Sequence, residues 1–181
     1  MAKENKSKYA LLGLLNFVPL SGYDIKKWTD NSLRFFWSEN YGHIYPLLKE
    51  LEKAELVTRQ KVDSEKGPSK NVFTITQKGT KEFLAWLKQN ENPETYRIEI
   101  LLKLFFSSKL ALNEIIVKLE NHIHQQEQLL SEYKEVENGF DHIKDKRIRL
   151  SAEMTMSYGF MHAEMNINWA RDTIAKIKTF R

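Results

Sequence analysis

Side chains that can contact nucleic acid are concentrated in one segment, residues 38–56. Tyr41, His43, Tyr45 and Lys49 present hydroxyl, imidazole and ammonium groups, which hydrogen-bond to base edges or pair with phosphates. An apolar stripe with helical spacing runs between them, so the pattern predicts a helix with one buried face and one polar face. We interpret this segment as a recognition helix. The stripe consists of Ile44, Leu47, Leu48, Leu51 and Ala54.

The start of this helix is predicted from Ser38 and Pro46. Ser38 is a favourable N-cap residue, and proline is tolerated in a first turn, where its missing N–H has no partner in any case. We therefore expect the regular helix to begin near Tyr45, after a tight turn over residues 40–44. This N-terminal end is the part of a recognition helix that usually meets base edges.

The segment after the helix predicts a β-hairpin. Residues 56–62 and 71–76 read as strands, and residues 63–70 between them are rich in Gly, Pro and Ser. Helix, strand, basic turn and strand form the pattern of a winged helix-turn-helix domain, whose wing lies over phosphates or a minor groove. This stretch contains six basic and three acidic residues. The basic ones are Arg59, Lys61, Lys66, Lys70, Lys78 and Lys81, and the acidic ones are Asp63, Glu65 and Glu82.

The composition indicates a soluble globular protein rather than a disordered one, with 41% apolar and 29% charged residues. The 181 residues include no cysteine, which excludes disulfides and cysteine-based zinc sites. Residues 1–90 hold 15 basic and 10 acidic residues, a net charge of +5, whereas residues 91–181 hold 13 and 14, a net charge of −1. No phosphate-binding glycine loop, serine nucleophile motif or carboxylate pair points to catalysis, so we expect neither an enzyme nor a cofactor.

The apolar run from Tyr9 to Val18 follows Lys3, Lys6 and Lys8 and so imitates a signal peptide. It lacks a cleavage pattern, and about ten residues are too few to span a bilayer. The run instead predicts a helix over residues 9–17. We expect no membrane partner and a cytoplasmic location.

A second helix is predicted over residues 23–29, after a turn at residues 20–22. Ser21 is the expected N-cap, and Asp24 gives an acidic first turn. Residues 30–32 are expected to end this helix. An aromatic cluster follows, which we interpret as the plug of a small core; the alternative is that part of it faces a ligand cavity. The cluster comprises Leu33, Phe35, Phe36 and Trp37.

A polar linker with a proline at residues 90–94 separates two predicted domains, residues 1–90 and 91–181. The second domain is nearly all helical, and its last helix has two apolar faces, which require more than one neighbour. Two long helices cannot bury such stripes alone, so we predict a homodimer, in agreement with the symmetry of most operators. The expected helices are residues 78–90 before the linker and residues 97–108, 110–137 and 144–179 after it.

Motifs along the whole chain carry a family resemblance. In the first half they are YALLGLL at 9–15, LSGYDI at 20–25, FWS at 36–38, IYPLLKEL at 44–51 and FTITQKG at 73–79. These motifs resemble the PadR-like family of bacterial transcriptional regulators. PET at 93–95 and EILLK at 99–103 are similar to its longer branch, which phenolic-acid regulators and virulence activators share. The resemblance implies a mainly α fold, with an N-terminal winged helix-turn-helix, a small β-hairpin wing and an all-helical C-terminal dimerisation domain.

The resemblance also implies partners and residue roles. It implies a homodimer that binds double-stranded DNA, represses a nearby promoter and, in some members, is released by a small molecule. Tyr45 falls on the family's recognition-helix motif and would contact a phosphate or base through its hydroxyl; its alternative role is an ordinary half-buried tyrosine. Lys49 would meet phosphate. Sequence preference would reside in Asn40, Tyr41 and His43, and the wing contacts would be Lys66, Ser69 and Lys70.

A methionine-rich aromatic face on the last helix is either a packing surface or an adaptable site for a flat apolar effector. We expect such a site between the two domains. Its candidate residues are Phe105, Tyr158, Met161, His162, Met165 and Trp169. No metal site is expected, because His122 and His124 point about 200° apart on a helix. The alternative function is a helical protein-interaction module whose winged domain binds no DNA.

Overall fold

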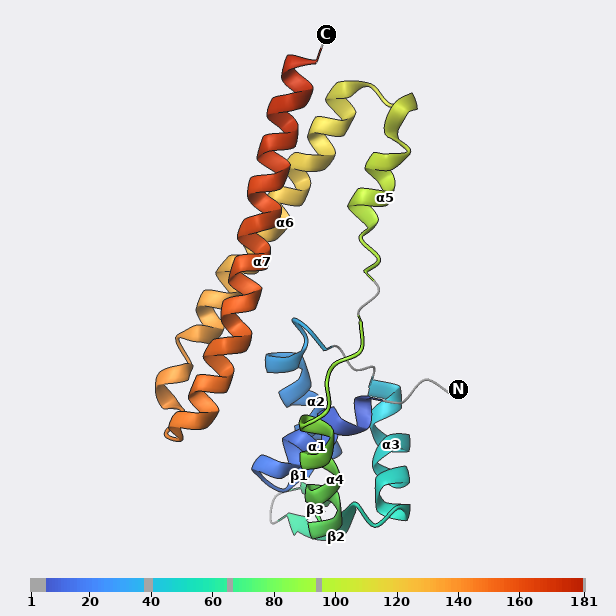
Figure 1. Ribbon diagram of the computed structural model, residues 1–181. Helices are drawn as coiled ribbons and strands as arrows, with labels where there is room; N and C mark the ends of the chain where they lie inside the picture. Colours follow the sequence, from blue (N-terminus) through green and yellow to red (C-terminus); the bar gives the residue numbers. More distant parts are fainter. Residues whose placement is uncertain (1–5, 38–40, 65–66, 94–95, 181) are drawn as a thin grey trace. The chain divides into compact units, whose positions relative to one another are not determined.

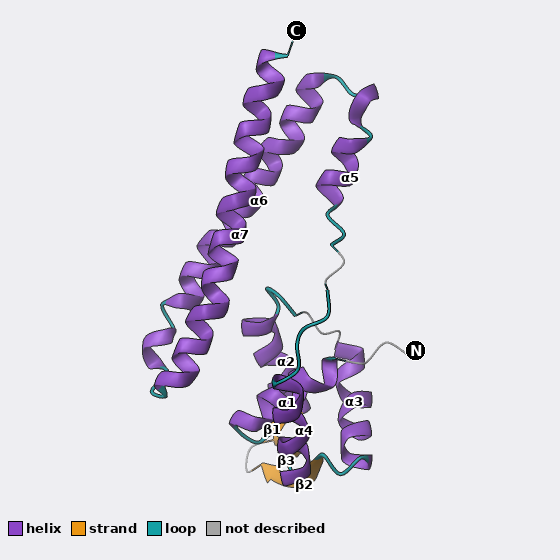
Figure 2. Ribbon diagram, viewed as in Figure 1, coloured by secondary structure: helices purple, strands orange, loops and turns teal. Residues whose placement is uncertain are grey.

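The computed structural model of the protein describes residues 6–37, 41–64, 67–93 and 96–180. The chain folds as two compact units, residues 1–93, here called the head, and residues 94–181, here called the helical unit. The described strands all lie in the head (Figure 1, Figure 2). The predicted fold class, mainly helical with a small antiparallel sheet, is confirmed. Within the described ranges, no helix is long and apolar enough to cross a membrane.

The head surrounds one apolar core, because α1, α3 and the sheet each turn an apolar face inward. Its elements are α1 (Ser7–Phe17), β1 (Leu20–Ser21), α2 (Gly22–Trp28), a π-helical turn (Thr29–Leu33), α3 (Tyr41–Lys53), β2 (Val57–Ser64), β3 (Gly67–Ile75) and α4 (Gln77–Leu87). The core residues are Tyr9, Leu11, Leu12, Leu14, Leu15, Leu20, Ile25, Ile44, Leu47, Leu48, Leu51, Leu56, Val57 and Phe73.

The wing is longer than the sequence predicts. β2 and β3 pair in antiparallel register from Val57 opposite Ile75 out to Ser64 opposite Gly67, so most of the turn expected at residues 63–70 is strand. The Gly- and Pro-rich composition indicated a turn, but backbone pairing continues past a bulge between Val62 and Ser64. Residues 20–22, also expected to be a turn, supply the two-residue strand β1, which pairs with β3 and gives the order β1-β3-β2.

The N-cap predicted for α2 is confirmed. The Asp24 N–H donates to Ser21 Oγ at 3.2 Å, and the Asp24 carboxylate accepts from the Ser21 N–H at 3.2 Å and from its hydroxyl at 2.7 Å. This reciprocal arrangement satisfies donors that a helix N-terminus leaves unpaired. It also joins the end of β1 rigidly to the start of α2.

The chain after α2 departs from the prediction that residues 30–32 end the helix. It continues instead as a π-helical turn, in which the buried Thr29 hydroxyl donates to the Ile25 carbonyl at 2.9 Å. The aromatic residues beyond it are not a core plug: Phe36 and Trp37 are exposed, and only Leu33 of the cluster packs against the core. A single stretch with adjacent aromatics cannot direct all of them inward.

Helix α3 begins at Tyr41, so Pro46 lies in its second turn rather than its first, contrary to the expected start near Tyr45. Pro46 removes one backbone N–H donor from the second turn, and the helix continues beyond it to Lys53. Ser38, the expected N-cap, lies outside the described residues. The apolar stripe is buried as predicted except for Ala54, which is exposed because the helix already ends at Lys53.

The end of α3 stores backbone strain at Glu55. Its φ of 60° is left-handed, a conformation that favours glycine. We expect Glu55→Gly to stabilise the head by about 1 kcal/mol, since glycine is the usual residue just past a helix. The lost ion pair with Lys78, at 3.4 Å between exposed groups, contributes little to stability.

Urea unfolding measures the change in stability. The control is Glu50→Gly, which lies inside the helix and should destabilise the head instead. An unchanged or lower midpoint for Glu55→Gly would contradict the strain.

The helical unit is built around the pair α6 and α7, which lie side by side (Figure 1). Asp145, the N-cap of α7, accepts from two backbone N–H groups, and Glu114 accepts from the Ala111 N–H at the start of α6. One buried cluster between the helices comprises Ile115, Leu119, Ala170 and Ile174. The elements are α5 (Glu99–Phe105), α6 (Leu112–Glu137) and α7 (Lys146–Thr179), with short 3-10 turns at Ser107–Lys109 and Phe140–His142.

Candidate nucleic-acid interface

Helix α3 exposes the side that the sequence assigns to DNA. Ile44, Leu47 and Leu48 are buried and hold the helix against the core. Tyr45 and Lys49, one turn apart, therefore share an exposed side, and His43 is exposed as well. Tyr41 is the first residue of α3, but its side chain is not described. Asn40 and Lys66 lie outside the described residues.

Tyr45 is exposed, with 41% of its surface accessible, and part of its ring lies against Gly22, the first residue of α2. A methyl group at Gly22 would be 2.7 Å from Cε1 of the Tyr45 ring and 2.8 Å from its Cζ. The tyrosine thus packs against Gly22 while part of it remains open to solvent. Both the contact role and the ordinary half-buried role predicted for Tyr45 are compatible with this position.

The predicted wing residues Ser69 and Lys70 are both exposed on β3. Lys70 Nζ lies 3.7 Å from Asp24 Oδ2, so the same carboxylate that caps α2 also faces the wing. Both side chains are solvated, and a pair of this kind contributes little to stability. Its geometry nevertheless places the Lys70 ammonium beside the N-terminal turn of α2, where Tyr45 also lies.

Hydrogen bonds from Ser21, with the Lys70 charge as a smaller contribution, lower the pKa of Asp24 below its ordinary value. A carboxyl whose pKa is lower in the folded state stabilises the fold above its unfolded pKa, and this stabilisation is lost as the pH falls through the folded pKa. We expect Asp24→Asn to destabilise the head by about 1 kcal/mol at neutral pH, with the difference from the wild type vanishing in acid.

Urea unfolding across a pH series measures this effect. The matched control is Asp30→Asn, which removes an exposed carboxylate from the adjoining π-helical turn and should change the neutral-pH stability by less than about 0.5 kcal/mol. A constant difference between Asp24→Asn and the wild type at every pH would show that the Asp24 charge contributes nothing to the cap.

Two other basic residues of the wing region bind the end of α3. Arg59 Nε donates to Glu52 at 3.1 Å, and Lys78 Nζ donates to the Ala54 carbonyl at 2.8 Å. These contacts fasten the end of α3 to the sheet and to α4. The basic cluster read from the sequence therefore has two parts, one that holds the scaffold and one, with Lys70, at the wing surface.

Tyr23 is an exposed residue of the second predicted helix, and the DNA contacts predicted from the sequence do not include it. It lies in the first turn of α2, next to Gly22, and is 66% exposed. Its exposure follows from its spacing, because Tyr23 and the buried Ile25 are two residues apart and point to opposite sides of a helix. Tyr23 adds an exposed hydroxyl and ring to the surface of the head.

The effector candidates lie on two helices. Tyr158, Met161 and Met165 form an exposed face of α7, and the Tyr158 and His162 rings stack with centroids 6.0 Å apart. Phe105 belongs to α5 and packs edge-on against Phe106. Trp169 is partly buried against the α6–α7 contact. The structure therefore places five of the six candidates on α7 and Phe105 on α5.

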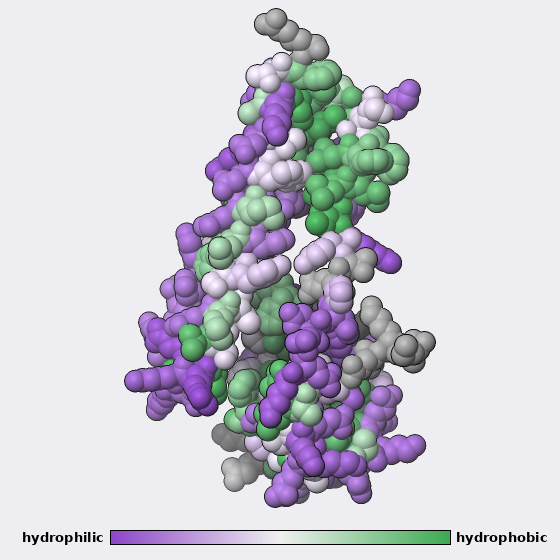
Figure 3. Space-filling view, viewed as in Figure 1, coloured by the Kyte–Doolittle hydropathy of each residue, from purple (hydrophilic) through white to green (hydrophobic). Residues whose placement is uncertain are grey.

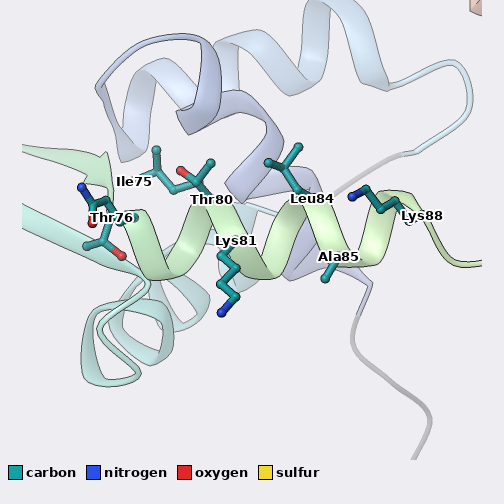
Figure 4. A pocket seen from close by; sticks show the side chains of 8 residues that line it. Ile75, Thr76, Thr80, Lys81, Leu84, Ala85 and Lys88 are labelled. Carbon is teal, nitrogen blue, oxygen red and sulfur yellow. The ribbon is translucent and has the colours of Figure 1, made fainter.

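Two hollows lie among the described residues of the head, and neither is lined by an effector candidate. One runs along α4 and is lined by residues that include Thr80, Lys81 and Leu84; Thr80 and Leu84 point to one side of the helix and Lys81 to the other (Figure 4). The other is lined by residues of α2 and the π-helical turn, including Asp24 and Trp28. Among the residues that the structure describes, no group of three or more histidine or carboxylate side chains is placed to hold a metal ion.

Comparison with family models covers most of the chain. The model of the transcriptional regulator PadR-like family matches residues 11–85, and the model named virulence activator alpha C-term matches residues 96–178. Among curated proteins, the chain is similar to the negative transcriptional regulator PadR of Bacillus subtilis (strain 168), with 34% identity over 126 residues, which is 69% of each chain.

Solved structures of similar proteins include ligand complexes. The chain is similar to Bacillus subtilis PadR in complex with operator DNA, with a TM-score of 0.89, 26% identity, and coverage of 97% of this chain and 99% of that chain. It is also similar to Bacillus subtilis PadR in complex with p-coumaric acid, with a TM-score of 0.80, 26% identity, and coverage of 99% and 100%.

Proposed function

This chain belongs to the PadR-like family of transcriptional regulators, and from that membership we propose that it is a repressor that binds a pseudo-palindromic operator as a homodimer. The family consists of transcriptional regulators rather than enzymes. The observation that carries the proposal is the similarity over nearly the whole chain to a relative solved with operator DNA. A regulator of this kind acts where the DNA is, so we place it in the cytoplasm.

In the proposed complex the N-terminal part of α3 enters the major groove. Tyr45 and Lys49 contact the operator from one side of α3. Their exposure in the head supports this role. Lys70 and Ser69 contact phosphates from the wing. Lys70 would leave its solvated ion pair with Asp24 to do so, because the DNA backbone carries a higher density of negative charge. The remaining proposed contacts are Asn40, Tyr41, His43 and Lys66.

The proposed homodimer is supported by α5. This helix has only seven residues, and helices shorter than about 12 residues are marginal in water without packing. Yet Leu102 and Phe105 are 61% and 82% exposed, and Figure 3 shows apolar side chains gathered over this region. A second copy of the chain that covers α5 accounts for both features. Two heads one helical turn apart would then read the two half-sites.

Release by a small molecule is the second part of the proposal. A relative has been solved with p-coumaric acid, a flat molecule with an apolar ring. The exposed α7 face with Tyr158, Met161 and Met165 suits such a molecule, because methionine adapts its shape to an aromatic ring. Phe105, His162 and Trp169 complete the proposed set. The effector would weaken DNA binding by its higher affinity for the conformation that does not bind DNA.

The experiment that tests DNA binding is fluorescence anisotropy on the promoter fragment upstream of the chain's own gene, with random DNA as the control. We expect specific binding that weakens about a thousandfold between 50 and 200 mM salt, as for proteins with several phosphate contacts. In vitro transcription from the bound promoter then separates a repressor from an activator, and titration with p-coumaric acid tests release. Binding indifferent to sequence, both here and in a genomic-fragment selection, would contradict the proposal.

A further inference from the structure

Gly22 lies where the recognition helix meets α2. A methyl group at this position would be 2.7 Å from Cε1, 2.8 Å from Cζ and 3.0 Å from the hydroxyl oxygen of Tyr45. Carbon atoms in ordinary contact are about 3.5 to 4.0 Å apart, so even the smallest side chain overlaps the tyrosine ring. The ring occupies the space that the missing side chain leaves.

Backbone conformation does not explain the glycine. No glycine in the described ranges has a positive φ, and Gly22 is the first residue of α2. Alanine is favoured over glycine within a helix, so Gly22→Ala is acceptable to the backbone itself. The conflict is with the tyrosine alone among the nearest neighbours of the added methyl group.

The tyrosine is also the group that would move. The backbone of α3 is fixed by Ile44 and Leu48, which are 1% and 0% exposed. Tyr45 is 41% exposed, and its ring turns about two side-chain bonds. A methyl group at Gly22 therefore displaces the ring by about 1 Å toward solvent, the difference between the overlap and an ordinary contact distance. The head keeps its core.

We infer that Gly22 is a positioning residue: its missing side chain sets the place of the Tyr45 hydroxyl on the surface that meets the operator. This inference rests on the proposed function. Hydrogen bonds to oxygen acceptors span about 2.5 to 3.0 Å, so a displacement of about 1 Å is enough to break one. Gly22 thus affects DNA affinity without needing to touch DNA.

The test is a double-mutant cycle with Gly22→Ala, Tyr45→Ala and the double variant, measured by anisotropy on the promoter fragment at one salt concentration. We expect each single variant to bind at least about tenfold more weakly, the loss of roughly one good hydrogen bond. The double variant should bind as weakly as Tyr45→Ala and no weaker, because the two residues act through one hydroxyl. The melting temperature of Gly22→Ala should stay near that of the wild type.

Gly13→Ala is the matched control in the same head. Its added methyl group would meet the Phe83 ring at 3.3 Å, within the scaffold and not at Tyr45, so stability changes while operator affinity does not. Wild-type affinity in Gly22→Ala, or an additive loss in the double variant, overturns the positioning role alone. A wild type that fails to bind operator DNA selectively overturns the proposed function, and the positioning role with it.

Discussion

Replacing Gly79 by alanine is expected to destabilise the head by about 3 kcal/mol or more, near the upper end of overpacking effects. A methyl group at this position would lie 2.1 Å from the carbonyl oxygen of Leu56 and 2.9 Å from Cγ1 of Ile75. The first of these atoms belongs to the backbone, so no side-chain rotation relieves the overlap. Helix α4 would have to move away from the sheet.

The carbonyl of Leu56 is held in place by the residue that caps α4. The Thr76 N–H donates to it at 3.0 Å, and the Thr76 hydroxyl, which donates to the neighbouring Glu55 carbonyl at 2.8 Å, lies 3.2 Å from it. The same hydroxyl oxygen accepts from the Gly79 N–H at 3.0 Å. Moving α4 away from this carbonyl therefore disturbs both the hydrogen bond that caps α4 and the hydrogen bond between Thr76 and Leu56. The expected loss of stability thus exceeds that of a simple side-chain overlap.

Differential scanning calorimetry of the full chain measures this prediction. The transition of the head should fall by about 15 °C, given about 4 to 8 °C per kcal/mol for a domain of this size, while that of the helical unit stays in place. Gly22→Ala is the matched control, because its closest neighbour is the movable end of a side chain. A drop of less than about 3 °C for Gly79→Ala would show that the backbone yields easily.

Local patterns in the sequence were sufficient to predict helix α3 and its buried face. Ile44, Leu47, Leu48 and Leu51 recur with helical spacing, and all four are buried, which leaves Lys49 on the outside as expected. The capping contact between Ser21 and Asp24 was predictable for the same reason, because the two residues are three apart. Periodicity and capping are properties of one segment and need no knowledge of the rest of the fold.

Contacts between distant segments could not be read in this way. Gly22 and Tyr45 are 23 residues apart, and Asp24 and Lys70 are 46 apart, so no spacing rule connects them. The strand at Leu20–Ser21 exists only because β3 offers it backbone partners, which composition does not reveal. The exposure of Phe36 and Trp37 was missed because hydrophobicity predicts burial only when a neighbouring surface is available.

The second large effect is expected from Leu102→Asp combined with Phe105→Asp, which should convert the proposed homodimer into monomers. Both side chains are mainly exposed in the single chain, on a helix too short to be stable alone. In a dimer that covers α5, two carboxylates per chain would be buried without partners. Each costs several kcal/mol, so the dissociation constant should rise by a factor of at least about 1,000, which corresponds to about 4 kcal/mol.

Sedimentation velocity over a concentration series measures this change, and anisotropy measures its consequence for DNA. Operator affinity should fall together with dimerisation, because a single head reads only one half-site. Leu84→Asp with Leu87→Asp is the matched control, since it places the same charges on exposed apolar residues of the head and should leave association intact. A wild type that sediments as a monomer at micromolar concentration, or an α5 variant that remains dimeric, would mean that α5 is covered by something other than a second copy.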